Sequence, residues 1–410
     1  MLARWLGLAA LAVAALAASG CAGSGAATSD NATGGVLAVY SSLPLQGPSA
    51  AISQELVNGE KLALASAGGR AGHFRVGYNS LDDSNPANGH WSPGVTASNA
   101  KTAAEDTSTI AFIGDFESAA TAISLPLINA AGIPQLSAGS PYVGLTSSLD
   151  AGQDEPERFY PTGRRSFARL GPGDQVQAEA EVSLMRTLHV KKVYLLDDQD
   201  PFSTPLAELV AGDAQAAGIT VVAHDSLSLV AGGVYTSEAE KVAESGAEAV
   251  FYAGGGTGGA ADLWRALHAA APHLMLLAGA TAAVEPFTGE LGEAGPSTYI
   301  ATPILPAALY PPAGKRVLAE YTRVFGTPGN GYALYGYEAM TLVLGAIRRA
   351  GRHGNDRRTV TARLLEPRAR NSVLGPYSIE SDGETSLARF AVYRILGGTE
   401  SFYRTIDLSH

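Results

Sequence analysis

Residues 109–136, TIAFIGDFESAATAISLPLINAAGIPQL, decide the fold of this chain. The stretch begins with an apolar run at 109–113 that favours a β-strand and ends with another at 133–136. Between them, 118–131 has a helical pattern of apolar residues, and Gly132 follows where a helix would end. A strand, a helix and a second strand in this order form a right-handed β-α-β unit with parallel strands.

The same alternation extends in both directions from this unit. Upstream, the pattern predicts strands at 36–40 and 73–78 and helices at 50–67 and 95–105. Downstream, a polar stretch at 148–165 contains prolines and glycines, so we expect a long connecting loop there.

A second block of alternating elements follows this loop. Its expected strands lie at 192–196, 221–222, 249–252 and 274–277. Its expected helices lie at 175–188, 205–217, 237–245 and 260–271. Two successive blocks of similar size indicate an α/β protein with two doubly wound, parallel-sheet lobes. Such lobes would be joined by a hinge and would face each other across a cleft.

The C-terminal part of the chain is expected to return to both lobes. The pattern predicts a long helix at 332–350 and strands at 377–379, 391–395 and 401–406. The roughly 375 residues that follow the N-terminal segment are too many for one core, which also favours two lobes. The expected lobes comprise residues 36–170 plus 302–374, and residues 171–301 plus 375–410.

The N-terminus has the pattern of a secretory signal. One early cation, Arg4, precedes an apolar run at 5–18, and small residues lead to Cys21, the only cysteine of the chain. The sequence around Cys21 resembles a bacterial lipobox, in which the cysteine is acylated and anchors the protein to the membrane. Residues 1–21 would then be the signal, and 22–35, which lack bulky side chains, a flexible tether. The alternative is an ordinary signal peptide with an incidental cysteine. Both interpretations place the protein outside the cytoplasm.

Composition and motifs argue against several classes of function. The formal net charge of −11 opposes binding to a phosphate backbone, so no nucleic-acid partner is expected. The chain contains neither a G-x-S-x-G nor an H-E-x-x-H motif, and its eight histidines lack metal-ligand spacing. We therefore expect no enzyme, no metal and no cofactor. The pairs Asp82-Asp83 and Asp197-Asp198 follow predicted strands, where they would cap helices or line the cleft wall.

Several short segments, in order, resemble those of one family. They are PLQGP at 44–48, NGEKLA at 58–63, LDD at 81–83, IGDFES at 113–118, NAAGIP at 129–134 with LS at 136–137, VYLLDD at 193–198, GYEA at 336–339, and GPYS at 375–378 with DG at 382–383. Together they resemble the type I periplasmic binding proteins of the branched-chain amino acid group, over nearly the whole chain from Val36. The resemblance implies a substrate-binding protein of an ABC importer. Such a protein closes its hinge on a small polar solute, an amino acid or a related carboxylate or amide, and presents it to a membrane permease.

The resemblance also implies ligand-binding residues in the first lobe. Ser118 follows a strand and begins a helix, where free backbone N–H groups and the helix dipole can receive a carboxylate. Its alternative role is that of an N-cap residue. Gly139 and Ser140 match the second carboxylate-binding turn of the family, although Pro141 replaces the threonine of that turn.

In the second lobe, the resemblance points to three further positions. Asp174 matches the entry to that lobe and is a candidate acceptor for a ligand ammonium, or else the cap of the helix that follows. Gly255 stands where the branched-chain binders carry an aromatic residue, and Thr281 where they carry a carboxylate. Loss of both side chains implies a roomier and less acidic ligand pocket.

Two other classes of function compete with the transport interpretation. GGGTGG at 254–259 contains a G-x-G-x-x-G match between a predicted strand and helix, which is compatible with a dinucleotide-binding enzyme. That fingerprint normally opens the first β-α-β unit, whereas here it lies deep in the second lobe. A ligand sensor that acts through a signalling partner would share the fold and the cleft.

Overall fold

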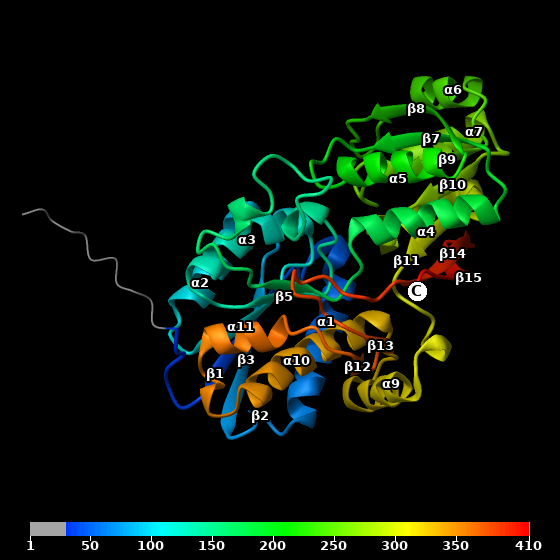
Figure 1. Cartoon of the computed structure of the whole chain (residues 1–410). Coiled ribbons are helices and arrows are strands. Elements are labelled where there is room, and N and C mark those ends of the chain that lie inside the picture. The colour runs from blue at the N-terminus through cyan, green and yellow to red at the C-terminus, as the bar shows by residue number, and fades with distance from the viewer. Residues whose placement is uncertain (1–29, 410) are drawn as a thin grey trace, which may run out of the picture.

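The computed structural model describes residues 30–409, which form two sheets, each covered by helices on both faces (Figure 1). The expected signal, Cys21 and most of the expected tether lie outside the described residues. In Figure 1 the first lobe lies at the lower left and the second at the upper right. Both sheets are mainly parallel, which confirms the predicted α/β class.

The first sheet has the strand order β2-β3-β1-β4-β5-β6. Its strands are β1 (Leu37–Leu43), β2 (Arg70–Ala71), β3 (Phe74–Asp82), β4 (Thr109–Gly114), β5 (Gln135–Ser137) and β6 (Phe167–Arg169). All neighbours are parallel except β2, which pairs antiparallel with β3. The β-α-β unit predicted from 109–136 therefore lies between β1 and β6 in this sheet.

Helices from both ends of the chain cover the first sheet. On one face, α1 (Ala50–Ser66), α10 (Gly331–Ala350) and α11 (Arg357–Leu364) share a core with β1 and β4. On the other, α2 (Pro93–Glu105) and α3 (Ser118–Ala130) pack on Phe112. The further helix α9 (Pro312–Phe325) packs its buried Leu318 into the first core.

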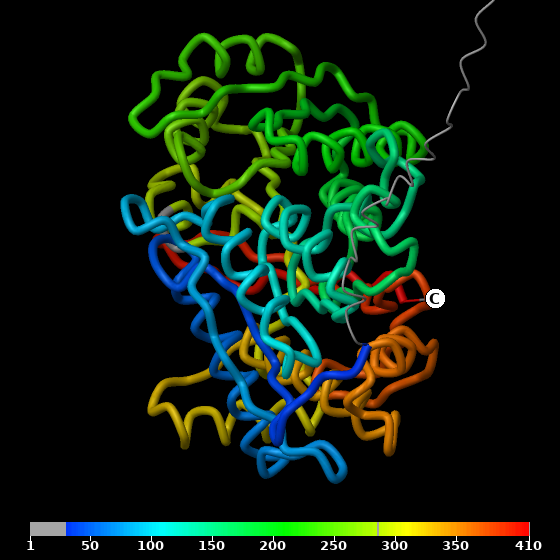
Figure 2. The backbone as a smooth tube through the Cα atoms, turned by 90° about the vertical axis from the view of Figure 1, so that its left-hand side faces the viewer, coloured from blue at the N-terminus to red at the C-terminus, as the bar shows by residue number. Residues whose placement is uncertain are grey.

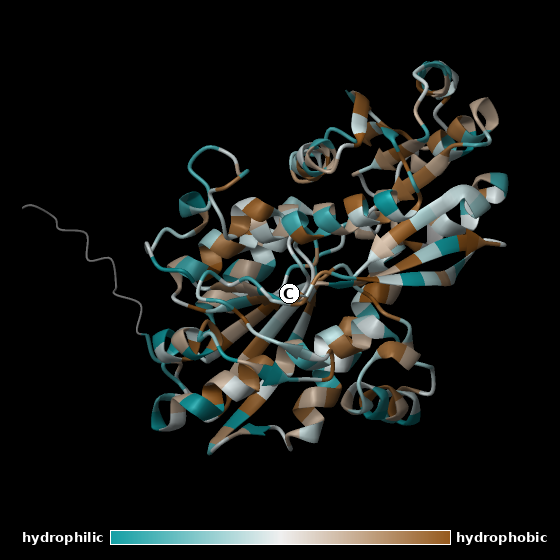
Figure 3. Ribbon diagram, turned by 45° about the vertical axis from the view of Figure 1, so that its right-hand side comes forward, coloured by the Kyte–Doolittle hydropathy of each residue, from teal (hydrophilic) through white to brown (hydrophobic). Residues whose placement is uncertain are grey.

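The second sheet has the order β15-β14-β11-β10-β9-β7-β8. Its strands are β7 (Lys192–Asp197), β8 (Thr220–Ser226), β9 (Ala249–Tyr252), β10 (Met275–Ala278), β11 (Thr298–Thr302), β14 (Arg389–Leu396) and β15 (Thr399–Asp407). Strands β7 to β11 are parallel, and β14 and β15 add an antiparallel edge. Figure 3 shows hydrophobic residues concentrated along the strands of both sheets.

Two helices cover each face of the second sheet. Helices α4 (Asp174–Thr187) and α5 (Thr204–Ala216) lie on one face, and α6 (Thr236–Glu244) and α7 (Ala260–Ala270) on the other. The short helix α8 (Glu285–Glu290) follows β10 and places Phe287 in the same core as α7. Two short strands, β12 (Arg370–Asn371) and β13 (Pro376–Tyr377), form a hairpin outside both sheets.

The chain passes between the lobes three times, after β6, after β11 and before β14. In the side view of Figure 2, the red C-terminal segment runs across the middle of the molecule. Thr302 still pairs with Ala391 in the second sheet, whereas the side chains of Tyr377 and Ile379 pack in the first core. We therefore propose that the second boundary between the lobes lies after Thr302, one residue later than expected, and that the third lies near Arg389 instead of at residue 375.

Candidate functional site

Polar loops follow the carboxyl ends of the parallel strands in both lobes. In open α/β sheets, ligands bind outside these strand ends, so the loops after β4, β5, β7 and β9 are the first place to look for a site. The sequence-predicted residues Ser118 and Gly255 lie in this position, after β4 and β9 respectively. Polar groups of both loops therefore lie where ligands bind in sheets of this kind.

Ser118 is the first residue of α3 and is 9% exposed. Its Oγ accepts a hydrogen bond of 3.1 Å from the backbone N–H of Tyr142, which ties the loop after β4 to the turn after β5. A serine hydroxyl can accept and donate at once, so this contact leaves Ser118 able to donate to a ligand. No side-chain capping bond is present at the start of this helix, so the N-cap alternative is not the role observed.

Gly139 and Ser140 shape the turn after β5. The Gly139 N–H donates to Ser137 Oγ over 3.1 Å, and a side chain at Gly139 would overlap the carbonyl oxygen of Phe116. Ser140 is fully buried in a left-handed conformation (φ 52°), and its hydroxyl lies 2.7 Å from Thr121 Oγ1 and 3.0 Å from the carbonyl oxygen of Asp115. In this conformation both residues hold the turn through contacts inside the first lobe.

Three carboxyl groups gather beneath these loops. Asp83 and Asp115 are fully buried; Asp83 Oδ2 accepts from Ser42 Oγ over 3.2 Å, and Asp115 Oδ2 accepts from the hydroxyl of Ser124. Burial, and after it the charge of Asp83, raises the pKa of Asp115. Burial and the same charge raise the pKa of Glu117 to about 8. Burial and mutual repulsion therefore make these carboxyl groups harder to ionise than those of an exposed acidic loop.

Asp174 begins α4 at the entry to the second lobe. It is 2% exposed, and its N–H donates to the carbonyl oxygen of Pro141 over 2.9 Å. Burial raises its pKa to about 7, against the opposing charge of Arg169. Ser118 and Asp174 thus bond to adjacent residues of one segment, Pro141 and Tyr142. The structure brings these two predicted residues together.

Arg169 also binds the segment around Pro141 and Tyr142. This guanidinium is fully buried; Nη1 donates to Ser140 O over 2.7 Å, and Nη2 donates to Tyr142 O over 3.0 Å. It also forms an ion pair of 3.1 Å with Glu384, on the segment that leads back to the second lobe. Arg169 therefore connects the turn after β5 with two of the three crossings between the lobes.

The second lobe contains a cavity of about 380 Å³ at the ends of β7 and β9. It is lined by Asp198, Gln199, Asp200, Pro201, Leu229, Tyr252, Thr257 and Gly258. Gly255 borders this cavity, because its N–H donates to Asp198 Oδ2 over 3.0 Å. Thr281, which is exposed, donates to the carbonyl oxygen of Gly254 over 3.0 Å. Gly255 therefore borders the cavity without lining it, whereas Thr281 contacts only the glycine loop beside it.

The glycine loop 254–259 is explained by packing. A side chain at Gly256 would overlap Val284 and the carbonyl oxygen of Ala282, and one at Gly259 would overlap Tyr235. These glycines allow close contact with neighbouring loops of the same lobe. The strand that follows, β10, leads to Gly279, and the acidic residue that a dinucleotide site places there is missing from this position.

One aromatic pair joins the two lobes. The rings of Tyr142, after β5, and Phe202, after β7, lie 5.0 Å apart in a T-shaped arrangement. Sequence reasoning identified neither residue, nor Tyr252 and Thr257 of the cavity. Their position at the end of a strand or within five residues of one was the available signal, since the strand-end rule applies to every parallel strand of both sheets.

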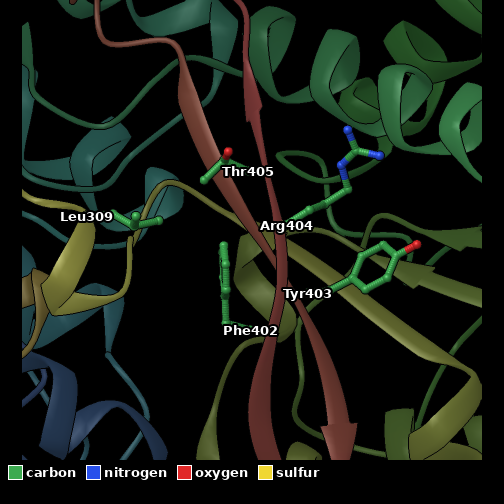
Figure 4. A pocket seen from close by; sticks show the side chains of 5 residues that line it. All are labelled: Leu309, Phe402, Tyr403, Arg404 and Thr405. Carbon is green, nitrogen blue, oxygen red and sulfur yellow. The ribbon is translucent and has the colours of Figure 1, made fainter.

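A second cavity, of about 590 Å³, lies away from these loops along the edge strand β15 (Figure 4). It is lined by Leu309, Phe402, Tyr403, Arg404 and Thr405. None of the sequence-predicted site residues belongs to it. Within residues 30–409 there is no group of His, Cys, Asp or Glu side chains that could hold a metal ion, and no helix has the length and apolar character needed to cross a bilayer.

Comparisons with solved structures show the same fold. A leucine-binding protein LivK of Thermotoga maritima aligns with a TM-score of 0.76 and 19% identity over 91% of this chain and 99% of its own. A solute-binding protein of an R. palustris ABC transporter in complex with benzoate aligns with a TM-score of 0.71 and 16% identity over 90% of this chain and 96% of its own. LivJ of Streptococcus pneumoniae in complex with isoleucine aligns with a TM-score of 0.73 and 16% identity over 91% of this chain and 99% of its own.

Comparison with family profiles identifies the chain's relatives. The profile of a family described as periplasmic binding protein matches residues 41–399, although no curated protein matches the sequence. This match confirms the resemblance inferred from the short motifs. The family consists of non-enzymatic binding proteins, which confirms the expectation that this chain functions by binding and not by catalysis. The chain belongs to the periplasmic binding protein family.

Proposed function

We propose that this chain is the solute-binding component of an ABC importer and that it closes its two lobes around one small polar solute. The observation that carries the proposal is the arrangement of Ser118 and Asp174 on either side of the segment 141–142. From that segment, Tyr142 reaches Phe202 of the second lobe. Polar loops of both sheets therefore meet around one segment, which suits hinge closure on a guest.

The proposed ligand is an amino acid or a related small carboxylate. The solved relatives bind leucine, isoleucine or benzoate, each of which carries a carboxylate. In the first lobe, Ser118 at the start of α3 supplies a hydroxyl and lies among the free N–H groups of the helix terminus. Gly139 and Ser140 would hold the turn beside it in place.

The proposed contacts of the second lobe differ from those of the first lobe. Asp174 is buried in this conformation, so its proposed role as an acceptor for a ligand ammonium requires the lobes to move. Gly255 and Thr281 would contribute mainly by leaving space. A side chain at Gly255 would meet only Thr257 Oγ1, at 4.0 Å. This space allows ligands larger than leucine.

A binding screen tests this function. Purified protein from residue 30 onward would be mixed with leucine, isoleucine, benzoate and 4-hydroxybenzoate, and its melting temperature measured. A solute bound only by the folded state raises that temperature. We expect a rise with at least one of these compounds, and no rise with any solute of a wider amino-acid and carboxylate panel would contradict the function.

We also propose that the protein is exported and anchored to the membrane through acylated Cys21. The small-residue approach to that cysteine supports this proposal. In the native host, the full chain should partition into the detergent phase of Triton X-114, and the Cys21→Ala variant into the aqueous phase. Equal partitioning of both would contradict the lipid anchor and favour an ordinary signal peptide.

The second candidate function is that of a sensor. The same fold and site would serve a protein that signals through a partner, because closure of the two lobes can be recognised by a permease or by a signalling protein. Uptake of the identified solute by cells that lack this gene separates the two. Lost uptake supports transport, whereas normal uptake with lost transcriptional response supports sensing.

A further inference from the structure

Residues 348–370 form a strongly basic segment in an otherwise acidic chain. They include eight of its 28 Lys and Arg residues but only two acids, Asp356 and Glu366, whereas the whole chain has a formal net charge of −11. The segment comprises the last turn of α10, the turn at 351–353, α11 and the chain that leads to β12. Positive charge is therefore concentrated in one part of the first lobe.

The hairpin of β2 and β3 adds two more arginines to this part of the surface. Its turn packs on the end of α10, because a Cβ at Gly72 would lie 4.0 Å from the Cα of Arg348, and Gly354 lies against the ring of Phe74. We call the exposed arginines of the segment and of the hairpin the basic face. It consists of Arg70, Arg75, Arg348, Arg352, Arg358 and Arg363.

The two acids of the segment do not neutralise the basic face. Asp356 caps α11, since its Oδ1 accepts from the Thr359 N–H over 2.6 Å. Glu366 is shared between Arg349 and Arg363, with N–O distances of 3.8 and 3.5 Å. The other five arginines of the basic face form no ion pair with any described residue. Most of its positive charge is therefore not balanced by neighbouring side chains.

Further arginines beside the basic face repel one another. Burial, and after it the charges of Arg370 and Arg368, lower the pKa of Arg349. Burial also lowers the pKa of Arg370, and the charge of Arg368 lowers it further. A nearby anionic surface would relieve this repulsion between like charges.

The described chain begins at the basic face. The Arg357 N–H donates to the carbonyl oxygen of Asp30 over 2.7 Å, and the Ala32 N–H donates to that of Asn355 over 2.7 Å. Cys21, the proposed site of acylation, precedes Asp30 by nine residues. Even a fully extended chain of that length spans only about 30 Å, so a lipid on Cys21 would keep this end of the first lobe close to the bilayer.

The basic face lies at the opposite end of the first lobe from the candidate site. The site loops follow the carboxyl ends of β4 and β5, whereas the β2-β3 hairpin precedes most of β3, and residues 30–32 precede β1. In Figure 1 the hairpin, α11 and the end of α10 lie at the lower left, away from the second lobe. A surface that contacts the basic face therefore leaves the site loops uncovered.

We propose that the basic face docks on the anionic phospholipid headgroups of the membrane to which Cys21 attaches the protein. This inference rests on the proposed lipid anchor and gives the anchored protein a defined orientation, with the first lobe against the bilayer and the site loops directed towards solution. An anionic lipid surface increases affinity by roughly fivefold for each Lys or Arg held near it. Several unpaired arginines on one face can therefore hold the lobe against the membrane once the anchor has brought it there.

Vesicle sedimentation tests the docking. The chain from Ala22 onward keeps every described residue and lacks the acylated cysteine, so its binding does not depend on the anchor. The vesicles contain either equal parts of phosphatidylglycerol and phosphatidylcholine or phosphatidylcholine alone. We expect at least tenfold tighter binding to the anionic vesicles in about 50 mM NaCl, and loss of this preference in about 500 mM NaCl, because salt screens exposed charges.

The double variant Arg352→Gln/Arg358→Gln should weaken binding to the anionic vesicles at least tenfold, because two charges leave the basic face. Arg164→Gln/Arg186→Gln is the matched control, since it removes two exposed arginines that lie elsewhere, and it should bind like the unmodified protein. An unchanged melting temperature verifies that both variants fold.

Equal binding to both kinds of vesicle, or equal binding of the two double variants to the anionic vesicles, would overturn the docking. Neither result would affect the proposed solute binding, which the binding screen tests, or the lipid anchor. The anchor is tested separately by detergent partitioning of the Cys21→Ala variant.

Discussion

Ser118 stands where three parts of the first lobe meet. It follows the loop after β4, it begins α3, and its Oγ holds the backbone N–H of Tyr142 at 3.1 Å. Tyr142 in turn contacts Phe202 of the second lobe. A change at this one hydroxyl therefore affects both the proposed contact to the solute and the position of the segment that joins the lobes.

Ser118→Ala should weaken solute binding by about 1–2 kcal/mol, or roughly 5- to 30-fold, if the hydroxyl contacts the ligand. Calorimetry with the tightest binder found in the binding screen measures this loss. Ser98→Ala, at an exposed serine of α2, provides the control and should bind normally. Unchanged affinity in Ser118→Ala would remove Ser118 from the binding site.

Glu60 gives the protein a pH-dependent stability. It is 1% exposed and accepts a hydrogen bond from the Tyr78 hydroxyl, and burial raises its pKa to about 8. The unfolded chain, with an ordinary carboxyl pKa near 4.5, releases this proton earlier. Its contribution to stability is therefore fully present below about pH 4.5 and is lost as the pH rises toward 8.

Glu60→Gln should consequently flatten the loss of stability between pH 5 and pH 8.5. The expected gain over the unmodified protein at pH 8.5 is of the order of a few kcal/mol in the free energy of unfolding. Urea unfolding at both pH values measures it, with Glu179→Gln on the exposed face of α4 as control. An equal pH dependence in all three proteins would show that Glu60 ionises normally in the folded state.

At the scale of elements, the closest helix contact of the first lobe depends on two glycines. A side chain at Gly59 of α1 would overlap the carbonyl oxygen of Ala333, and one at Gly336 of α10 would overlap that of Leu56. The two helices can approach this closely only because both positions lack a Cβ. Helix α10 is thereby held against α1, although residues 67–330 of the chain separate them.

Gly336→Ala should lower the free energy of unfolding by about 1–3 kcal/mol or more, because the added methyl group meets rigid backbone. Gly345→Ala in the same helix is the matched control. There the new Cβ would meet the mobile end of Arg349 at 3.2 Å, and the change should be within about 1 kcal/mol of neutral. Equal stability of the two variants would contradict the close-contact account.

The strand-helix alternation could be read from the sequence because buried parallel strands are short apolar runs between longer amphipathic segments. The expected helix at 332–350 corresponds to α10, and the expected strands at 391–395 and 401–406 correspond to β14 and β15. Helix α9 was missed, although its buried Gly314, Leu318 and Tyr321 have helical spacing. Gly314 carries no apolar side chain, which weakened that pattern.

The candidate site was predictable only in part, for a physical reason. The strand-end rule locates Ser118 and Gly255 from the sequence, because each follows a recognisable strand. The direction of a side chain depends on the local backbone, and the left-handed conformation of Ser140 turns its hydroxyl into the lobe. The cavity of the second lobe combines Asp198, directly after β7, with Tyr252, the last residue of β9, and no sequence spacing shows that these two positions meet.

At the scale of the whole molecule, three crossings connect the two lobes, and one ion pair links two of them. Arg169 lies at the end of β6, and Glu384 lies before β14. Because the connections are short segments rather than a shared sheet, the lobes can move as bodies about them. Movement of this kind is what the proposed enclosure of a solute requires.

Small-angle X-ray scattering of the protein without and with a saturating amount of the tightest binder from the binding screen tests the central claim most directly. The account predicts a smaller radius of gyration in the presence of the binder, and no change with a compound of the screen that does not bind. Saturated binding, confirmed by calorimetry on the same sample, with an unchanged radius of gyration would contradict closure of the lobes around the solute.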